Sequence, residues 1–150
     1  MTFYSIALFL HLVGVLSLFA LLAIEGVSLR AGMAPGAPLR ILGPISLVTI
    51  LVPGFYLASQ VGWHGWVAVG LVSFVVIAAL GAYTGINFTR GRMDASAATV
   101  SWLARVGIAL GVVFDMTVKP NVLIAAAVVL VALVVGAGLG ALTRPKARTA

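Results

Sequence analysis

The sequence predicts an all-α polytopic membrane protein, a bundle of five transmembrane helices, and two observations lead to this fold class. Of its 150 residues, 63% are hydrophobic and only 8% are charged, whereas soluble domains carry roughly a quarter charged residues. Five stretches match the ~20 residues that a helix needs to cross the hydrocarbon, and these are roughly residues 3–25, 41–61, 66–87, 101–119 and 121–142. We therefore expect residues 1–143 to form the bundle and residues 144–150 to form a basic cytoplasmic tail.

The first span, residues 3–25, carries polar residues on one face. His11 and Glu25 share one side of the helix at helical spacing. We expect Glu25 near the cytoplasmic rim, snorkelling or paired with Arg30, and His11 about 12 Å below the outer edge at ~1.5 Å per residue. At that depth His11 is either a neutral side chain hydrogen-bonded within the bundle, or a ligand or proton carrier.

The loops between the middle spans are short. The second and third spans are joined by GWHG at residues 62–65, where Trp63 and Trp66 suit the membrane interface. The loop at residues 88–100 is the longest, and its second half can start a helix with Asp94 as the N-terminal cap.

The fourth and fifth spans are separated only by Lys119, Pro120 and Asn121. Proline disfavours helix for the residue before it and suits the first turn of the helix after it, so a tight turn is predicted. The alternatives are one long kinked helix, or a fourth element that only dips into the membrane, because Arg105 and Asp115 interrupt the fourth stretch. Arg105 lies one turn from the expected start and is expected to snorkel.

Basic residues predict the orientation of the chain, since they favour the cytoplasmic side. With five crossings, one side collects Arg30, Arg40, Arg90, Arg92, Arg105, Arg144, Lys146 and Arg148. Lys119 is the exception. We therefore expect the N-terminus outside and the C-terminus in the cytoplasm.

Small residues four apart allow membrane helices to approach closely. Three such pairs are expected to serve helix packing, namely Gly81 with Gly85, Gly107 with Gly111, and Gly136 with Gly140. In the second span Pro53 lacks the N–H that would continue the helix ladder, so a kink is predicted there.

The outer half of the predicted bundle collects the candidate site. Its residues come from three spans and a loop and are His11, Tyr56, Gln60, His64, Asp115 and Lys119. Asp115 continues the face of Gly107 and Gly111, and its spacing from Lys119 allows an ion pair. One acid, one permanent cation and two imidazole rings would suit an anion, a quinone-like head group, a metal ion or a proton.

Several chemistries are disfavoured. Without cysteine the chain has no disulfide, thiolate metal site or thiol redox chemistry. Haem between two histidines needs both at membrane depth, and only His11 qualifies, with Met116 beside Asp115 as an unconvincing second ligand. His11 is the best single candidate for a metal ligand. Basic residues sit in short loops and the tail, so no nucleic-acid partner is expected, and no motif identifies an enzymatic reaction.

Three short motifs carry a family resemblance. The first span, LFLHLVGVLSLFALLAIEGVSLR, resembles the start of small bacterial membrane proteins of the DUF2269 type, which are loosely similar to CopD-like proteins. GFYLASQVGWHGWVAVGL resembles their join between the second and third spans, and VVFDMTVKP their late Met-x-x-Lys-Pro ending. The resemblance covers most of the chain. It implies the bacterial inner membrane, copper handling through the CopD-like link, and a role for His11, Arg105, Met116, Lys119 and Pro120.

The sequence alone leaves three functions open. In the first, the protein binds or moves a small ligand, ion or proton through the polar pocket in the outer half of the bundle. Alternatively, it is an accessory or structural subunit of a membrane complex or a homo-oligomer. In the third alternative it is a redox protein that holds haem or a quinone through His11. The lipid bilayer is the partner common to all three.

Overall fold

The computed structural model describes residues 2–31, 33 and 36–143, without the side chains of residues 37–40. This part of the chain contains no strand and five helices, which are α1 (Phe3–Arg30), α2 (Ala37–Val61), α3 (Gly65–Thr89), α4 (Ala95–Val118) and α5 (Val122–Leu142). Each helix includes a stretch long and apolar enough to span a membrane. The predicted fold class is confirmed: this is a multi-pass membrane protein whose described residues form five helices. The predicted tail at residues 144–150 lies outside the described residues.

Local sequence signals set the ends of the last two helices. Asp94 caps α4 as predicted, since its Oδ1 accepts a hydrogen bond from the Ala97 N–H at 2.6 Å. This cap starts α4 at Ala95, well before the predicted span. Asn121 caps α5 by accepting the N–H groups of Leu123 and Ile124. The two helices are therefore separate, and the alternative of one long kinked helix is wrong.

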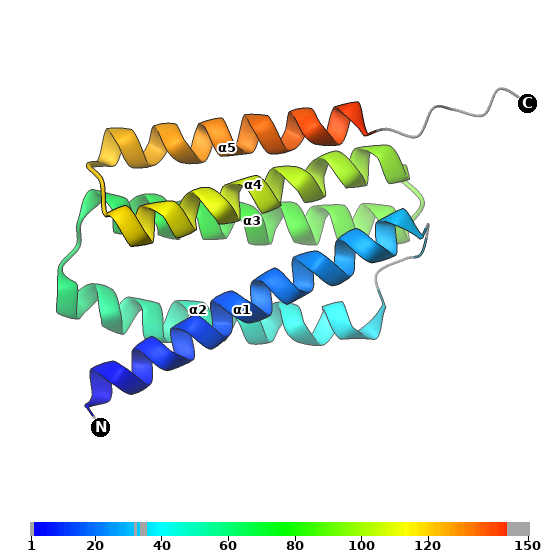
Figure 1. Ribbon diagram of the computed structural model, residues 1–150. Coiled ribbons are helices and arrows are strands. Elements are labelled where there is room, and N and C mark those ends of the chain that lie inside the picture. Colours follow the sequence, from blue (N-terminus) through cyan, green and yellow to red (C-terminus); the bar gives the residue numbers. More distant parts are fainter. Residues whose placement is uncertain (1, 32, 34–35, 144–150) are drawn as a thin grey trace, which may run out of the picture.

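The helices form two groups (Figure 1). In one group α1 and α2 run antiparallel against each other, and in the other α4 packs between α3 and α5. α1 lies slanted, so that it starts beside α2 and its C-terminal half reaches α4. α4 is thus the central helix, with contacts to α1, α3 and α5.

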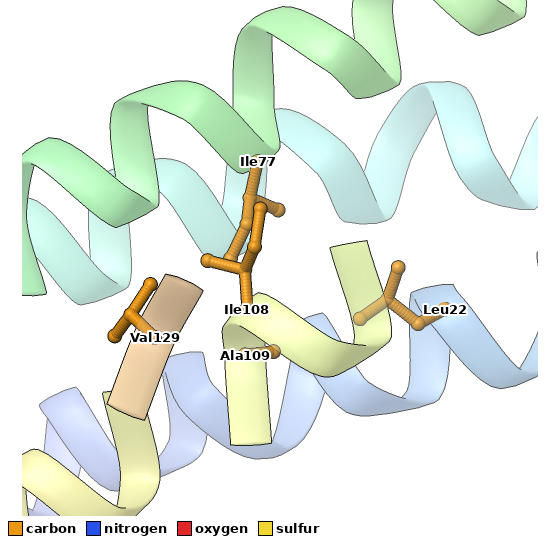
Figure 2. Close-up of a cluster of buried hydrophobic side chains, with 5 residues drawn as sticks. All are labelled: Leu22, Ile77, Ile108, Ala109 and Val129. Carbon is orange, nitrogen blue, oxygen red and sulfur yellow. The ribbon is translucent and has the colours of Figure 1, made fainter. Parts of the chain in front are cut away.

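The buried core is built around α4 (Figure 2). Its members come from four helices and are Leu22, Ile77, Ile108, Ala109 and Val129. Ile108 is 2% exposed and lies next to Ile77 of α3, with Val129 of α5 and Leu22 of α1 on either side. Because α2 contributes none of these side chains, it is held mainly through α1.

Glycines bring the backbones of α4 and α5 into direct contact. A Cβ at Gly107 would overlap the Ala132 carbonyl oxygen, and a Cβ at Gly111 would lie 3.0 Å from the Cα of Val129. Gly136 and Gly140 meet the α4 backbone in the same way, at Leu103 and Val100. These four predicted glycines therefore lie in one seam between α4 and α5, as small residues do where membrane helices approach closely.

The remaining predicted pair, Gly81 and Gly85, does not join two helix backbones. A Cβ at Gly85 would have no neighbour within 4 Å. A Cβ at Gly81 would lie 3.1 Å from Nη1 of Arg105, so this glycine makes room for a side chain. The four-residue spacing is the same as in the seam, but only the surroundings of each glycine distinguish the two uses.

The seam predicts a contrast between Gly107→Ala and Gly85→Ala. Gly107→Ala should lower the free energy of unfolding by ~1–3 kcal/mol, because its Cβ has no room and the helices must separate. Gly85→Ala should leave stability unchanged or raise it by up to ~1 kcal/mol, because alanine favours helix. Denaturant unfolding of the two variants in detergent measures the difference, and equal stabilities would contradict the seam.

One ion pair is buried in the described part of the bundle, between α1 and α4. Arg105 donates from Nη1 to Oε2 of Glu25 at 2.8 Å and from Nη2 to Oε1 at 2.5 Å. The two residues are only 2% and 4% exposed. The Arg105 Nε–H donates to the Ser101 carbonyl at 3.3 Å. The planar guanidinium matches the carboxylate with two parallel hydrogen bonds, so both charges are paired away from lipid and water.

The predicted snorkelling of Arg105 and the predicted pairing of Glu25 with Arg30 are both wrong. Because α4 begins at Ala95, Arg105 lies about 15 Å along the helix axis at ~1.5 Å per residue. It is buried rather than extended to the rim. The Arg30 guanidinium instead lies 5.8 Å from the centre of the Trp102 ring.

Glu25→Gln should destabilise the bundle by about 3–5 kcal/mol, because it leaves the Arg105 guanidinium buried without a counter-charge. The double variant Glu25→Gln with Arg105→Gln should recover much of this loss, since no charge is left unpaired. Unfolding of the double variant and of the two single variants, Glu25→Gln and Arg105→Gln, in detergent measures the coupling. A loss of stability in the double variant equal to the sum of the two single losses would contradict a coupled pair.

Candidate functional site

An open pocket of about 510 Å³ lies where the α2–α3 turn meets the α4–α5 turn. It is lined by Val61, His64, Gly65, Trp66, Lys119, Pro120, Asn121 and Val122. The starts of α3 and α5 lie side by side here, since a Cβ at Gly65 would be 2.6 Å from the Cβ of Val122. The lining thus contains a cation and an imidazole and no acidic side chain.

Lys119 has an unusual backbone. It ends α4 in the left-handed conformation, with φ of 54°, and its N–H donates to the Asp115 carbonyl at 2.8 Å. Glycine or asparagine usually fills this position, because a Cβ there costs roughly 1–2 kcal/mol. The Lys119 Nζ lies 5.8 Å from the centre of the Trp66 ring. Lys119 therefore brings its ammonium to the pocket although its left-handed backbone conformation is unfavourable for a residue with a Cβ.

The predicted ion pair between Asp115 and Lys119 is not present. The spacing of four residues brings two side chains together only while both residues stay helical. Lys119 leaves the helix through its left-handed conformation, and its ammonium lies over Trp66 instead.

His64 is oriented by a hydrogen bond and a stacking contact. Its Nε2 lies 3.1 Å from the Val61 carbonyl oxygen. Since a carbonyl only accepts, Nε2 carries the proton and Nδ1 is the acceptor in the neutral ring. The ring stacks on Trp66 with 6.2 Å between centroids and 18° between planes. Trp66 thus contacts both ionisable groups of the pocket, although the sequence predicts it only as an interfacial residue.

His11 lies in a different place, between α1 and α2. Its Nδ1 donates to the Ile50 carbonyl at 2.9 Å, which leaves Nε2 as the acceptor atom of the neutral ring. Gly54 makes room for the ring, because a Cβ there would lie 3.2 Å from Nδ1. Within residues 2–31, 33 and 36–143 no three His, Asp or Glu side chains gather in a way that could hold a metal ion.

Asp115 lies in the α4–α5 seam and is fully buried, at 0% exposure. It continues the face of Gly107 and Gly111, and the contact of Gly111 with Val129 puts Asp115 one turn further, opposite Ala125. Ala125 is also fully buried. Neither carboxylate oxygen of Asp115 has a hydrogen-bond partner among the described residues.

The six predicted site residues therefore fall into separate places. His64 and Lys119 line the pocket, and Asp115 lies in the α4–α5 seam. His11 lies between α1 and α2, where Tyr56 packs edge-on against Phe3. Gln60 is exposed near the end of α2. The reason is the grouping of the helices, because α2 packs on α1 whereas the α4–α5 seam belongs to the other group.

Sequence reasoning missed one contribution to the pocket and one to the interior of the bundle. Asn121 caps α5 and also lines the pocket, and its position after Pro120 at the start of an apolar run is a recognisable capping signal. Arg105 and Glu25 form the buried pair, and no local signal connects residues that are 80 positions apart.

Comparison of the chain with known protein families, with curated proteins and with solved structures found no match. The comparisons therefore assign no function to this protein.

Lys119→Gly should be more stable than Lys119→Ala by roughly 1 kcal/mol, because glycine adopts the left-handed conformation freely and alanine does not. Neither variant keeps the ammonium, so the comparison isolates the backbone. Thermal or denaturant unfolding in detergent provides the measurement. If the alanine variant were as stable as the glycine variant, residue 119 would not hold the left-handed conformation.

Proposed function

We propose that this membrane protein binds a small anionic ligand, a phosphate or carboxylate group, in the pocket between the α2–α3 and α4–α5 turns. The observation that carries the proposal is the Lys119 ammonium at a pocket whose lining includes no acidic side chain. The nearest aromatic ring, Trp66, faces it at 5.8 Å, which leaves the charge available to an anion.

Two further side chains at the pocket can bind an anion, whereas the helix ends do not favour either sign of charge. The N-termini of α3 and α5 and the C-termini of α2 and α4 all meet there, so their partial charges offset one another. Asn121 adds an amide side chain to the lining, and His64 adds an imidazole. At the edge of a bilayer, where the effective dielectric constant is lower than in water, each of these contributions is stronger.

We place this pocket on the outer face of a bacterial inner membrane. Arg30, Arg90 and Arg92 lie at the helix ends farthest from the pocket. An excess of arginine and lysine at one end of a membrane bundle is typical of the cytoplasmic side. Arg105 does not count toward this bias because it is buried in the bundle. The resemblance of the first span to DUF2269-type proteins favours the same membrane. The N-terminus is then outside, and the ligand reaches the pocket from the extracytoplasmic water or from the outer leaflet.

Fluorescence titration of the full chain in nanodiscs of neutral lipid tests the proposal. Added inorganic phosphate should change the emission of Trp66, and the change should be lost in Trp66→Phe. Lys119→Ala should weaken binding at least about tenfold, since a hydrogen bond to a charged group contributes ~1.5–3 kcal/mol. Arg92→Ala is the matched control. It removes an exposed cation at the other end of the bundle and should bind normally.

A second set of nanodiscs identifies the source of the anion. If the head group of an anionic lipid occupies the pocket, phosphatidylglycerol in the nanodisc should change Trp66 emission without added phosphate and should compete with it. If free phosphate or a carboxylate solute is the ligand, phosphatidylglycerol should have no effect. Equal responses of Lys119→Ala and Arg92→Ala in both lipids would contradict the proposal.

A further inference from the structure

The chain has three acidic side chains, and the structure gives them three different environments. Asp94 is exposed and caps α4. Glu25 is buried and paired with Arg105 through two hydrogen bonds. Asp115 is buried completely, and both of its oxygens lack a hydrogen-bond partner among the described residues. Asp115 is also outside the lining of the pocket, so an inference about this carboxyl does not rest on the proposed function.

The helices packed around Asp115 offer it no counter-charge. α5, which forms the other side of the seam, has no ionisable residue along Val122–Leu142. α3 has a single one, Tyr83, near its far end, and Tyr83 is 60% exposed. α1 meets α4 at Glu25, whose carboxylate is already paired with Arg105.

The nearby turn does not supply a counter-charge either. Lys119 is the closest cation in the sequence, and its ammonium lies over Trp66. An ionised carboxylate without a partner is very unfavourable away from water, whereas the neutral acid is far less so. The packed seam therefore favours the protonated carboxyl of Asp115.

We propose that Asp115 is a proton-binding site, which keeps its proton while α4 and α5 are packed and exchanges it with water when the seam beside the α4–α5 turn loosens. Asp115 lies three residues before the end of α4 at Val118, which is about 5 Å along the axis at ~1.5 Å per residue. Water at that membrane surface is therefore close to the carboxyl as soon as the seam opens.

A proton suits this site better than a metal ion does. A hard cation such as Ca²⁺ takes six to eight oxygen ligands. Asp115 contributes the only carboxylate in its surroundings, and the described residues contain no cluster of three His, Asp or Glu side chains. A proton needs one oxygen atom and no further ligand.

The proposal gives the direction of a pH response. The packed seam binds the proton and the opened seam releases it, so acid favours packing and alkali favours opening. The turn end of the α4–α5 hairpin thus responds to the proton concentration on its own side of the membrane.

Infrared difference spectroscopy of the full chain in lipid tests the site. The spectrum of the wild type minus that of Asp115→Asn should contain the C=O band of a protonated carboxyl, which shifts in D₂O and disappears as the pH rises. Asparagine has nearly the same shape and is always neutral, so the variant should fold. Absence of the band, or a band that stays constant at every pH, overturns the proposal.

Labelling with a hydrophobic carbodiimide adds a second, independent measurement. This reagent adds to a protonated carboxyl in an apolar environment, and mass spectrometry of peptides locates the added mass. Asp115 should be labelled, whereas the paired Glu25 and the exposed Asp94 should not, so the chain contains its own controls. Labelling of Glu25 or Asp94 to the same extent, or protection of Asp115 by sodium ions at constant pH, overturns the proposal.

Discussion

The buried pair of Glu25 and Arg105 is the interaction on which the arrangement of the two helix groups depends. α1 and α2 belong to one group and α3, α4 and α5 to the other, and the pair joins α1 to α4 with two hydrogen bonds. Apolar side chains provide little preference for one helix neighbour over another in lipid, because the lipid tails are equally apolar. A pair of opposite charges does provide it, since any other rotation of α1 or α4 would expose one charge to hydrocarbon.

α4 meets three neighbours by three different physical means. Its glycine face lets the α5 backbone approach closely, its apolar face packs Ile108 against the shared core, and its Arg105 binds α1. The hydroxyls of Ser101 and of Thr84 on α3 also share a hydrogen bond of 2.6 Å. Only near its C-terminal end does this helix carry a buried polar group without a partner among the described residues, Asp115. The hydrogen-bonded contacts thus lie in the N-terminal half of α4, and the unsatisfied group lies near the pocket.

The sequence predicts the depth of each residue in the membrane much better than it predicts which other residues that residue contacts. Hydropathy finds all five helices, the cap at Asp94 is recognisable, and the glycines of α4 and α5 are correctly expected in helix packing. The errors concern the rotation of a helix and its partner in space. For Glu25 the sequence favours the nearest cation in the chain, Arg30, although its real partner is on another helix. His11 and Asp115 are expected in one pocket because both are predicted in the outer half of the bundle, yet they pack against different helices.

The distance along the chain between Glu25 and Arg105 has a consequence for biosynthesis. Eighty residues separate the two charges, so α1 enters the bilayer long before its partner is translated. During that interval the acid of the first helix is exposed to lipid without compensation, or is neutral. Arrival of α4 ends this interval, and α5 follows it directly through the turn at Lys119. A nascent chain that ends before residue 105 therefore lacks the guanidinium that neutralises Glu25, and the contact between α1 and α4 can form only after α4 has been made.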